Sequence, residues 1–415
     1  MKARRYLFEL GNNPIISTSE LNAVFKSKIV SSKYLVEEIF ELEIALDESD
    51  SLENRLKSLG GIKKAAIILK TLPKDIDTKN LIQSICFEIE KISTLSSQKI
   101  NVGINTYNFH TSLKSIGMEI KKILKNKKIN LRIVNMDNKN LNSVSIIRNK
   151  LISNRGIDIN IVSTKEQIIL AKSVFCQNSL DYSKRDYGRP RRNAKSGMLP
   201  PKLAQIMLNI ANLKEGEKFL DPFCGSGTIL QEGLLKDFEC YGSDLTDESI
   251  LSSTENLTWL ADRYMKDPDA IKKIHIKKLD AKRVHTFGST LKAQAIVSEG
   301  TLGPPLLKNP TLSFADKIIR DIMDIYVPFF ENAPRILDKN ALIIMTFPVF
   351  KINQHQVVFS KDELLKKISK NYEIVNIINK DLINNYPLLK SIGLRCVYGR
   401  SDQIVLREIV ALRSR

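Results

Sequence analysis

The sequence predicts an α/β protein in which a doubly wound, mostly parallel sheet forms the carboxyl-terminal half and an α+β region precedes it. Two observations predict the sheet. Residues 218–220, of which Phe219 and Leu220 are apolar, run into a loop with two glycines and then into a helical segment at 229–236, the order of strand, loop and helix that such domains use. Near the end, 393–399 and 402–412 alternate as an antiparallel hairpin, which would close one edge of the sheet.

The length and charge of the chain bear on its organisation and partners. A chain of 415 residues is too long for one typical core and predicts two or three domains. Its 64 Lys and Arg against 46 Asp and Glu give a formal charge of +18. Such an excess favours a polyanionic partner, either nucleic acid or an anionic membrane surface. A general preference for Lys, Asn and Ile along the chain is the other explanation.

The cysteines and the amino terminus bear on metals and location. The five cysteines are scattered and never spaced as Cys-x-x-Cys; they are Cys86, Cys176, Cys224, Cys240 and Cys396. With only four histidines beside them, they predict reduced thiols and no structural zinc site. Residues 1–10 lack the apolar core of a signal peptide, and no apolar run approaches the ~20 residues of a membrane span. We therefore expect a soluble, cytoplasmic protein without a metal or a membrane partner.

The amino-terminal residues have the mixed pattern of a small α+β unit. Residues 6–10 alternate as a strand, and 17–19 are suited to cap a helix at 20–25. Further strands are predicted at 34–39 and 65–69. Pattern alone does not disclose what this unit does.

A basic stretch lies between residues 114 and 157, where the only acids are Glu119 and Asp137. Residues 118–125 predict an amphipathic helix whose lysines lie off the apolar face, and 141–150 alternate as a strand with two cations near its end. The candidate RNA contacts here are Lys121, Lys122, Lys125, Arg148 and Lys150. They either neutralise phosphates or form an ordinary solvated surface.

The segment 181–192 is basic and aromatic with little periodicity, and we place an interdomain linker at 166–190. Tyr182 and Tyr187 are interleaved with arginines, of which Arg189, Arg191 and Arg192 are candidate RNA contacts. Two interpretations stay open for this segment. The tyrosines and arginines either stack on bases and hold phosphates or form a charged connector on the following domain.

The glycine loop, 219–228, predicts a binding site for a small, partly anionic ligand, because main-chain N–H groups and a helix start meet there at the edge of the sheet. It lacks the third glycine of the dinucleotide fingerprint and the Gly-Lys-Ser/Thr ending of a P-loop, which argues against NAD and ATP. The next predicted strand, 239–245, ends in Asp244, a residue suited to accept hydrogen bonds from ribose hydroxyls. Asp280 follows a further strand candidate, 275–279.

The string Asp-Pro-Phe-Cys-Gly-Ser-Gly-Thr at 221–228 resembles the first motif of S-adenosylmethionine (SAM) dependent methyltransferases that modify exocyclic amines of nucleic-acid bases. The strings at 6–14 and 197–204 resemble those of tRNA guanine-N2 methyltransferases that carry a THUMP domain. The resemblance implies a ferredoxin-like plus THUMP RNA-binding region at 1–165. It also implies a Rossmann-like methyltransferase domain at 191–415, with a seven-stranded sheet, SAM as cofactor and tRNA as partner.

The resemblance also implies cofactor contacts, in which Asp221 orients the SAM amino group and Asp280 binds the adenine amine. The full set of expected cofactor-binding residues is Pro200, Asp221, Pro222, Phe223, Cys224, Gly225, Ser226, Gly227, Thr228, Asp244, Leu245, Asp280 and Ala281. The chain departs from the family after the predicted strand 293–297. Relatives carry Asp or Asn, two prolines and an aromatic there, to hold the target amine and to stack on the base.

This chain instead has Ser298, Glu299, Gly300 and Thr301 at that place, and these four are the catalytic candidates. We expect a tRNA methyltransferase that acts on the N2 amine of guanine, either as a monomer or with a small activating protein partner. Two alternatives stay open. One is a tRNA-binding homologue that keeps the SAM fold but has lost methyl transfer, and the other is a DNA amine methyltransferase.

Overall fold

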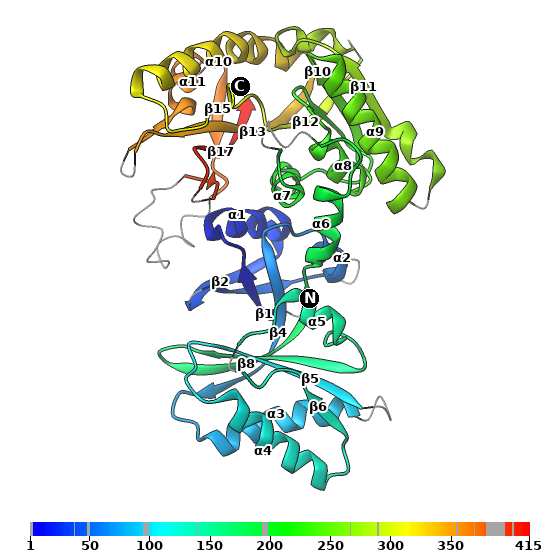
Figure 1. Ribbon diagram of the computed structural model, residues 1–415, viewed down its shortest axis with the longest axis vertical. Coiled ribbons are helices and arrows are strands. Elements are labelled where there is room, and N and C mark those ends of the chain that lie inside the picture. Colours follow the sequence, from blue (N-terminus) through cyan, green and yellow to red (C-terminus); the bar gives the residue numbers. More distant parts are fainter. Residues whose placement is uncertain are drawn as a thin grey trace.

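The computed structural model describes residues 3–36, 38–47, 50–93, 99–137, 139–192, 198–265, 267–288, 290–353, 356–368, 370–378, 395–400 and 402–415. The molecule is elongated, and its two sheets follow one another along the longest axis (Figure 1). The amino-terminal unit has an eight-stranded sheet and the carboxyl-terminal unit a nine-stranded one. Helices α1 (Pro14–Phe25), α6 (Ser179–Tyr187) and α7 (Pro201–Ala211) lie where the two units meet.

The amino-terminal sheet has the strand order β2-β3-β1-β4-β8-β7-β5-β6. Its first half contains β1 (Ala3–Leu10), α1, the short helix η1 (Lys26–Lys28), β2 (Ile29–Val36), β3 (Ile39–Ala45), α2 (Leu52–Lys57) and β4 (Ile62–Pro73). Its second half contains α3 (Thr78–Ser93), β5 (Ile100–Tyr107), α4 (Leu113–Asn126), β6 (Leu131–Ile133), α5 (Ser143–Arg148), β7 (Gly156–Ser163) and β8 (Gln167–Cys176). Antiparallel pairing of β4 with β8 joins the two halves into one sheet.

Each half has an apolar core of its own. In the first half, Phe8, Leu21 and Phe40 belong to one buried cluster. In the second half, α3 and α4 cover β5 and β7, and Ile85 and Ile120 pack against the sheet there. Burial of these side chains is the main stabilising contribution on each side of the β4–β8 seam.

Three sequence predictions in this unit need correction. Residues 141–150 contain the helix α5 and not a strand, because the Asn142 side chain accepts a hydrogen bond from the Ser145 N–H and caps a helical turn. Helix α1 already begins at Pro14, with Asn13 as its cap. The predicted linker at 166–190 holds β8 and α6, because the apolar run 168–171 is buried in the sheet, so the amino-terminal unit extends past residue 165.

The carboxyl-terminal sheet has the order β11-β10-β9-β12-β13-β17-β15, with β14 paired to β13 and β16 to β17. Its strands are β9 (Lys218–Asp221), β10 (Glu239–Asp244), β11 (Ile274–Lys278), β12 (Ala293–Ser298), β13 (Leu337–Lys351), β14 (Val357–Phe359), β15 (Tyr372–Val375), β16 (Val397–Tyr398) and β17 (Val405–Ser414). Strands β9 to β13 run parallel and β17 is antiparallel to β13. The predicted doubly wound, mostly parallel sheet with an antiparallel hairpin is therefore confirmed, but the sheet has nine strands and not the expected seven. Residues 393, 394 and 401 of the predicted hairpin lie outside the described residues.

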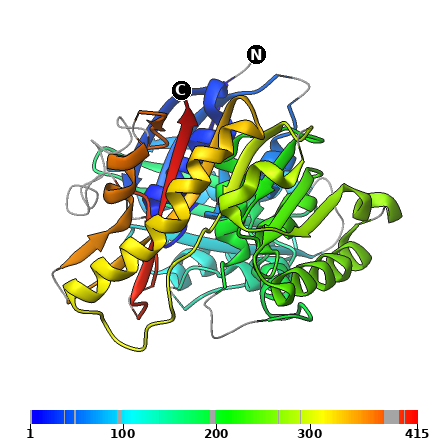
Figure 2. The ribbon, with the colours of Figure 1, turned by 90° about the horizontal axis from the view of Figure 1, so that it is seen from above.

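Helices cover both faces of this sheet. The helical elements are α7, α8 (Thr228–Leu234), α9 (Asp247–Tyr264), η2 (Pro268–Lys273), η3 (Ala281–Phe287), α10 (Leu312–Asn332), η4 (Ala333–Arg335) and α11 (Ser360–Ile368). Helices α7, α8 and α9 pack on one face and α10 and α11 on the other. Seen from above, α10 runs diagonally across β17 (Figure 2). In the described ranges no helix is long and apolar enough to cross a bilayer.

A buried polar contact fixes the two units against each other where α1 packs on α7. The Glu20 carboxylate of α1 is fully buried and accepts hydrogen bonds from the Gly60 and Gly61 N–H groups, both at 2.8 Å. The Asn209 side chain of α7 donates to the same carboxylate at 2.6 Å, and Lys236 donates to Asn209 at 2.7 Å. The orientation of the amino-terminal unit is thus set by groups from both sides.

Candidate functional site

The glycine loop connects β9 to α8 at the carboxyl ends of the parallel strands. Gly225 and Gly227 have φ angles of 51° and 81°, a backbone conformation that favours glycine. A Cβ atom on Gly225 would meet nothing within 4 Å, whereas one on Gly227 would contact Ser253 at 3.3 Å. There is therefore free space beside the main chain at Gly225, whereas the loop is closely packed at Gly227.

Asp221, the last residue of β9, is a buried acid of the glycine loop that precedes its two glycines. Its Oδ1 accepts hydrogen bonds from the Ser298 hydroxyl at 2.6 Å and from the Phe223 N–H at 3.2 Å. Burial raises the pKa of Asp221 to about 7, although the bond from Ser298 acts in the opposite direction. The part of the chain that the structure describes offers no cation to this carboxyl, so a bound ammonium group would be favoured beside it.

Asp244 and Asp280 lie at the same edge of the sheet, because β9, β10 and β11 are neighbouring parallel strands. Asp244 accepts hydrogen bonds from the Gly225 N–H at 3.0 Å and from the Thr246 N–H at 3.2 Å. Asp280 caps η3 by accepting from the Lys282 N–H at 2.9 Å. Each carboxylate oxygen has a further lone pair, so both acids keep capacity for a ligand while they hold their loops.

The other expected cofactor residues gather around the same loop. Pro222, Cys224, Thr228 and Ala281 are buried, Pro200, Phe223 and Ser226 are partly exposed, and Leu245 is 63% exposed. Pro200 is the residue before α7, and its carbonyl accepts from the Leu203 N–H at 2.9 Å. Gly197, the first residue of the string that resembles the family there, lies outside the described residues.

The end of β12 and the loop that follows it hold the four catalytic candidates, and the first of them, Ser298, points inward. Ser298 is fully buried and donates its hydroxyl hydrogen to Asp221. The Glu299 carboxylate forms an ion pair with Arg407, in which Oε1 lies 2.5 Å from Nε, and the Glu299 carbonyl accepts from the Thr346 hydroxyl at 2.7 Å. Burial raises the pKa of Glu299, although Arg407 acts to lower it.

Tyr326 of α10 holds the second part of this loop by hydrogen bonds to Thr301, and no local motif in the sequence pointed to this residue. Its hydroxyl accepts from the Thr301 N–H at 2.8 Å and donates to the Thr301 carbonyl at 3.0 Å. Its ring lies edge-on to Phe223 of the glycine loop, with centroids 5.9 Å apart. Gly300 has a φ of 69°, and a Cβ there would lie 2.3 Å from the Tyr326 hydroxyl. Tyr326 therefore contacts both the glycine loop, through Phe223, and the loop after β12, through Thr301.

The candidate RNA contacts are not brought together with this site. Lys121, Lys122 and Lys125 are exposed on α4, which lies at the end of the amino-terminal unit that faces away from the carboxyl-terminal domain (Figure 1). Arg148 and Lys150 are also exposed. Any surface that joins the α4 lysines to the glycine loop has to run along most of the molecule.

The three arginines near residue 190 have different environments. Arg189 is only 3% exposed and donates to the Thr228 hydroxyl at 2.6 Å, so it supports the start of α8 and is not available to RNA. This corrects the prediction for Arg189. Arg191 pairs with Glu255 at 2.7 Å, and Arg192 stacks on Tyr187 at 4.8 Å. Both remain exposed.

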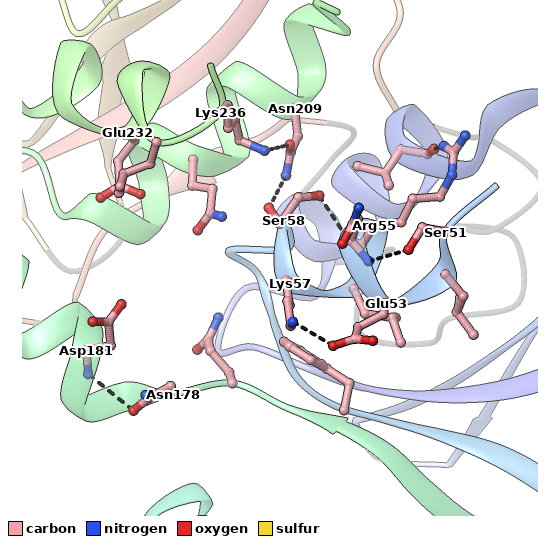
Figure 3. Close-up of a pocket in the computed structure, with 18 of the residues that line it drawn as sticks. Ser51, Glu53, Arg55, Lys57, Ser58, Asn178, Asp181, Asn209, Glu232 and Lys236 are labelled. Atoms are coloured by element: carbon pink, nitrogen blue, oxygen red, sulfur yellow. Dashed lines mark hydrogen bonds and ion pairs between the residues drawn. The ribbon is translucent and has the colours of Figure 1, made fainter. Parts of the chain in front are cut away.

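A wide cleft of 1680 Å³ lies between the two units, lined by residues of α2, α6, α7 and α8. Two of its lysines already have partners: Lys57 forms an ion pair with Glu53 at 2.6 Å and Lys236 donates a hydrogen bond to Asn209 at 2.7 Å, as Figure 3 shows. Lys150 is the one candidate RNA contact among its lining residues. The cleft is separate from the glycine loop. In the described ranges, His, Cys, Asp and Glu side chains form no group of three suited to a metal.

Comparison with known proteins identifies the domain that carries the glycine loop. The family described as RMKL-like, methyltransferase domain matches residues 189–300. This segment includes β9 to β12 and every expected cofactor residue. Residues 189–300 are therefore similar to a methyltransferase domain, in agreement with the resemblance of the first motif.

Two archaeal proteins illustrate the similarity in sequence. The tRNA (guanine(10)-N2)-dimethyltransferase of Methanocaldococcus jannaschii is 30% identical over 233 residues, which are 54% of this chain and 57% of that protein. The enzyme of the same name from Methanothermobacter thermautotrophicus is 34% identical over 113 residues, 27% of this chain and 30% of that protein. The matched segments thus span from under a third to somewhat over half of these relatives.

A solved structure extends the similarity in fold to the whole chain. The crystal structure of TrmN from Thermus thermophilus aligns over 99% of this chain and 100% of that chain, with a TM-score of 0.52 and 12% identity. At this identity the likeness concerns the fold. It confirms the prediction of a Rossmann-like methyltransferase fold.

Proposed function

We propose that this chain is an S-adenosylmethionine-dependent tRNA methyltransferase that methylates the N2 amine of a guanine. The curated relatives quoted above carry names of that activity. The observation that carries the proposal is the hydrogen bond from Ser298 to Asp221, which joins residues 298–301, here called the acceptor loop, directly to the glycine loop. Cofactor and acceptor would then meet at one edge of the sheet.

The residues of the glycine loop fit this cofactor. Asp221 is a buried carboxyl that gains by pairing with an ammonium group, and Gly225 leaves space for a ligand beside the main chain. Asp244 would hold the ribose hydroxyls and Asp280 the adenine amine. Bound SAM supplies a sulfonium methyl group, so an N–C bond forms as the C–S bond breaks, with loss of S-adenosylhomocysteine and one amine proton.

The protein would contribute position and exclusion of water, without a covalent intermediate. Tyr326 and Thr346 hold the acceptor loop from α10 and β13, so the amine can be aligned with the methyl group by a preformed surface. The amino-terminal unit, which we propose to contain a ferredoxin-like half and a THUMP half, would bind tRNA through exposed lysines such as Lys121 and Lys125. Its action as a monomer or with a small protein partner stays a prediction, as does a cytoplasmic location.

A tRNA-binding homologue without methyl transfer is the second candidate, because Ser298 is fully buried and Thr301 offers no aromatic ring. The purified chain incubated with SAM and tRNA transcripts separates the two candidates. Mass spectrometry of the nucleosides should detect N2-methylguanosine, and calorimetry should detect binding of S-adenosylhomocysteine. Binding without a methylated product would favour the second candidate, and a product on duplex DNA but not on tRNA would favour a DNA amine methyltransferase.

A further inference from the structure

The carboxylate of Glu299 is an oriented and accessible polar group of the acceptor loop. Ser298 is fully buried and bonded to Asp221. Gly300 has no side chain, and the main-chain groups of Thr301 are bonded to Tyr326. The Glu299 side chain is 20% exposed, and within the described ranges its Oε2 accepts no hydrogen bond.

Arg407 holds this carboxylate in place from the neighbouring strand β17. Its guanidinium is 4% exposed and contacts Oε1 of Glu299 at 2.5 Å. The Thr346 hydroxyl fixes the main chain of the same residue by its bond to the Glu299 carbonyl. Because Oε1 of Glu299 is bound by Arg407 and the main chain of Glu299 by Thr346, the side chain has few accessible conformations. Its second oxygen, Oε2, therefore has a defined direction.

We propose that Glu299, oriented by Arg407, is the residue that selects guanine as the target base, by accepting hydrogen bonds from the N1–H and N2–H groups of its Watson–Crick edge. The proposal rests on the function proposed above and names the substrate class of the same site. Arg407 is then a positioning residue. The aromatic platform that relatives place two residues later is not needed for this selection.

The selection follows from the donors and acceptors of the bases. Three bases carry an exocyclic amine, but only guanine has a second N–H donor, N1–H, beside it. Adenine presents the N1 lone pair next to its amine, and cytosine presents the N3 lone pair. An ionised carboxylate has acceptors only, so it repels these lone pairs and pairs with both donors of guanine. A site built to accept a hydrogen bond rejects an analogue that lacks the donor strongly.

The sharpest test changes the substrate and leaves the protein intact. Once the methylated position has been mapped with the wild-type chain, a tRNA is prepared with 2-aminopurine at that position. This base keeps the 2-amino group but has a lone pair at N1. We expect kcat/KM to fall by about 30-fold or more relative to guanine, with the affinity for S-adenosylhomocysteine unchanged. Equal rates on the two bases would overturn the proposal.

A variant supplies the complementary test. Glu299→Gln can keep its carbonyl toward Arg407 and present an amide N–H₂, a donor that suits the N1 lone pair of 2-aminopurine. We expect activity on guanine to fall and the preference for guanine over 2-aminopurine to shrink by about tenfold or more. Glu373→Gln is the matched control. Glu373 of β15 forms an exposed ion pair at 3.3 Å with Arg413, which lies on β17 as Arg407 does. Its preference should equal that of the wild type.

The outcomes separate this proposal from the proposed function. A wild-type chain that methylates no tRNA would overturn both. A wild-type chain that makes N2-methylguanosine, with a base preference that Glu299→Gln leaves unchanged, would overturn only the role of Glu299. Methyladenosine or methylcytidine as the product would overturn the selection of guanine while methyl transfer stands. Arg407→Lys should shrink the preference in the same direction as Glu299→Gln, because a point charge does not reproduce the guanidinium contact.

Discussion

The Ser298 hydroxyl donates a 2.6 Å hydrogen bond to the Asp221 carboxylate, and this bond joins the two loops of the proposed active site. Asp221 ends β9 and Ser298 ends β12, and these strands are direct neighbours in the sheet. A cation that pairs with Asp221 therefore acts one hydrogen bond away from the acceptor loop. Cofactor binding and the position of the acceptor loop should be coupled through this pair.

The affinity for SAM should depend on pH through Asp221. The pKa of Asp221 is raised to about 7 by burial, and only the ionised carboxylate pairs with the cofactor ammonium. The dissociation constant for SAM should therefore be about tenfold higher near pH 5.5 than near pH 7. Calorimetry in two buffers of different ionisation enthalpy checks this, because proton release should accompany binding below pH 7. Asp221→Asn should bind weakly at both pH values, and a flat profile for the wild type would contradict the assignment.

The same group should affect stability in the opposite sense. The folded pKa of about 7 lies above the ordinary value of 3.8, so the stabilising contribution is complete at low pH and is lost as the pH rises through 7. Asp221→Asn, which still accepts from Ser298, removes this loss. At pH 8 and without cofactor, the variant should therefore melt at a higher temperature than the wild type, although it binds SAM less well.

Asp244→Ala should weaken SAM binding about tenfold or more, or on the order of 1.5 kcal/mol for a lost charged hydrogen bond. Asp244 also accepts from the Gly225 N–H, so part of the effect comes from the loosened loop. Asp244→Asn keeps an acceptor for that N–H and should lose less affinity than alanine. Unchanged affinity in the alanine variant would remove Asp244 from the cofactor site.

The places of the glycine loop and of its acids in the fold could be predicted from the sequence, because each place depends on a local rule. A strand end followed by glycines places Asp221, Asp244 and Asp280 at one edge whatever the rest of the chain does. Tyr326 and Arg407 were not predicted as site residues, because they reach the acceptor loop from α10 and β17 and only the packing of the sheet brings them there. The strand predicted at 141–150 was wrong because two local signals conflict there. The alternation of apolar residues favours a strand, but the Asn142 side chain caps a helical turn and the segment forms α5.

The exposed lysines of α4 should contribute to tRNA affinity through phosphates. Replacing Lys121, Lys122 and Lys125 by Glu should lower the affinity and flatten its dependence on salt, because fewer counterions are released on binding. Filter binding at several salt concentrations measures the slope. The triple change of Lys272, Lys366 and Lys367 to Glu, all exposed in the carboxyl-terminal domain, is the control for net charge. An unaltered slope in the α4 variant would leave its lysines as solvated surface.

Glu20→Ala should strongly lower the free energy of unfolding, because it removes the buried contact between the two units. The substitution leaves the Gly60 and Gly61 N–H groups without their acceptor and Asn209 without one of its partners. We expect a loss of about 3 kcal/mol, seen as a lower midpoint in urea. Glu53→Ala removes an exposed pair with Lys57 and should change stability by less than about 1 kcal/mol. Equal midpoints for the two variants would mean that the contact does not hold the units together.

Tyr326→Phe should separate the position of the acceptor loop from cofactor binding. The ring and its contact with Phe223 remain, so the core and the glycine loop keep their packing. The two hydrogen bonds to Thr301 are lost, and the loop that carries Glu299 gains freedom. We therefore expect kcat to fall about tenfold or more while the affinity for S-adenosylhomocysteine stays within about twofold, since a loosened acceptor no longer holds the amine in line with the methyl group. Single-turnover kinetics and calorimetry measure the two quantities. A parallel loss of both would mean that Tyr326 acts on the whole domain, because the glycine loop would then depend on the same hydroxyl.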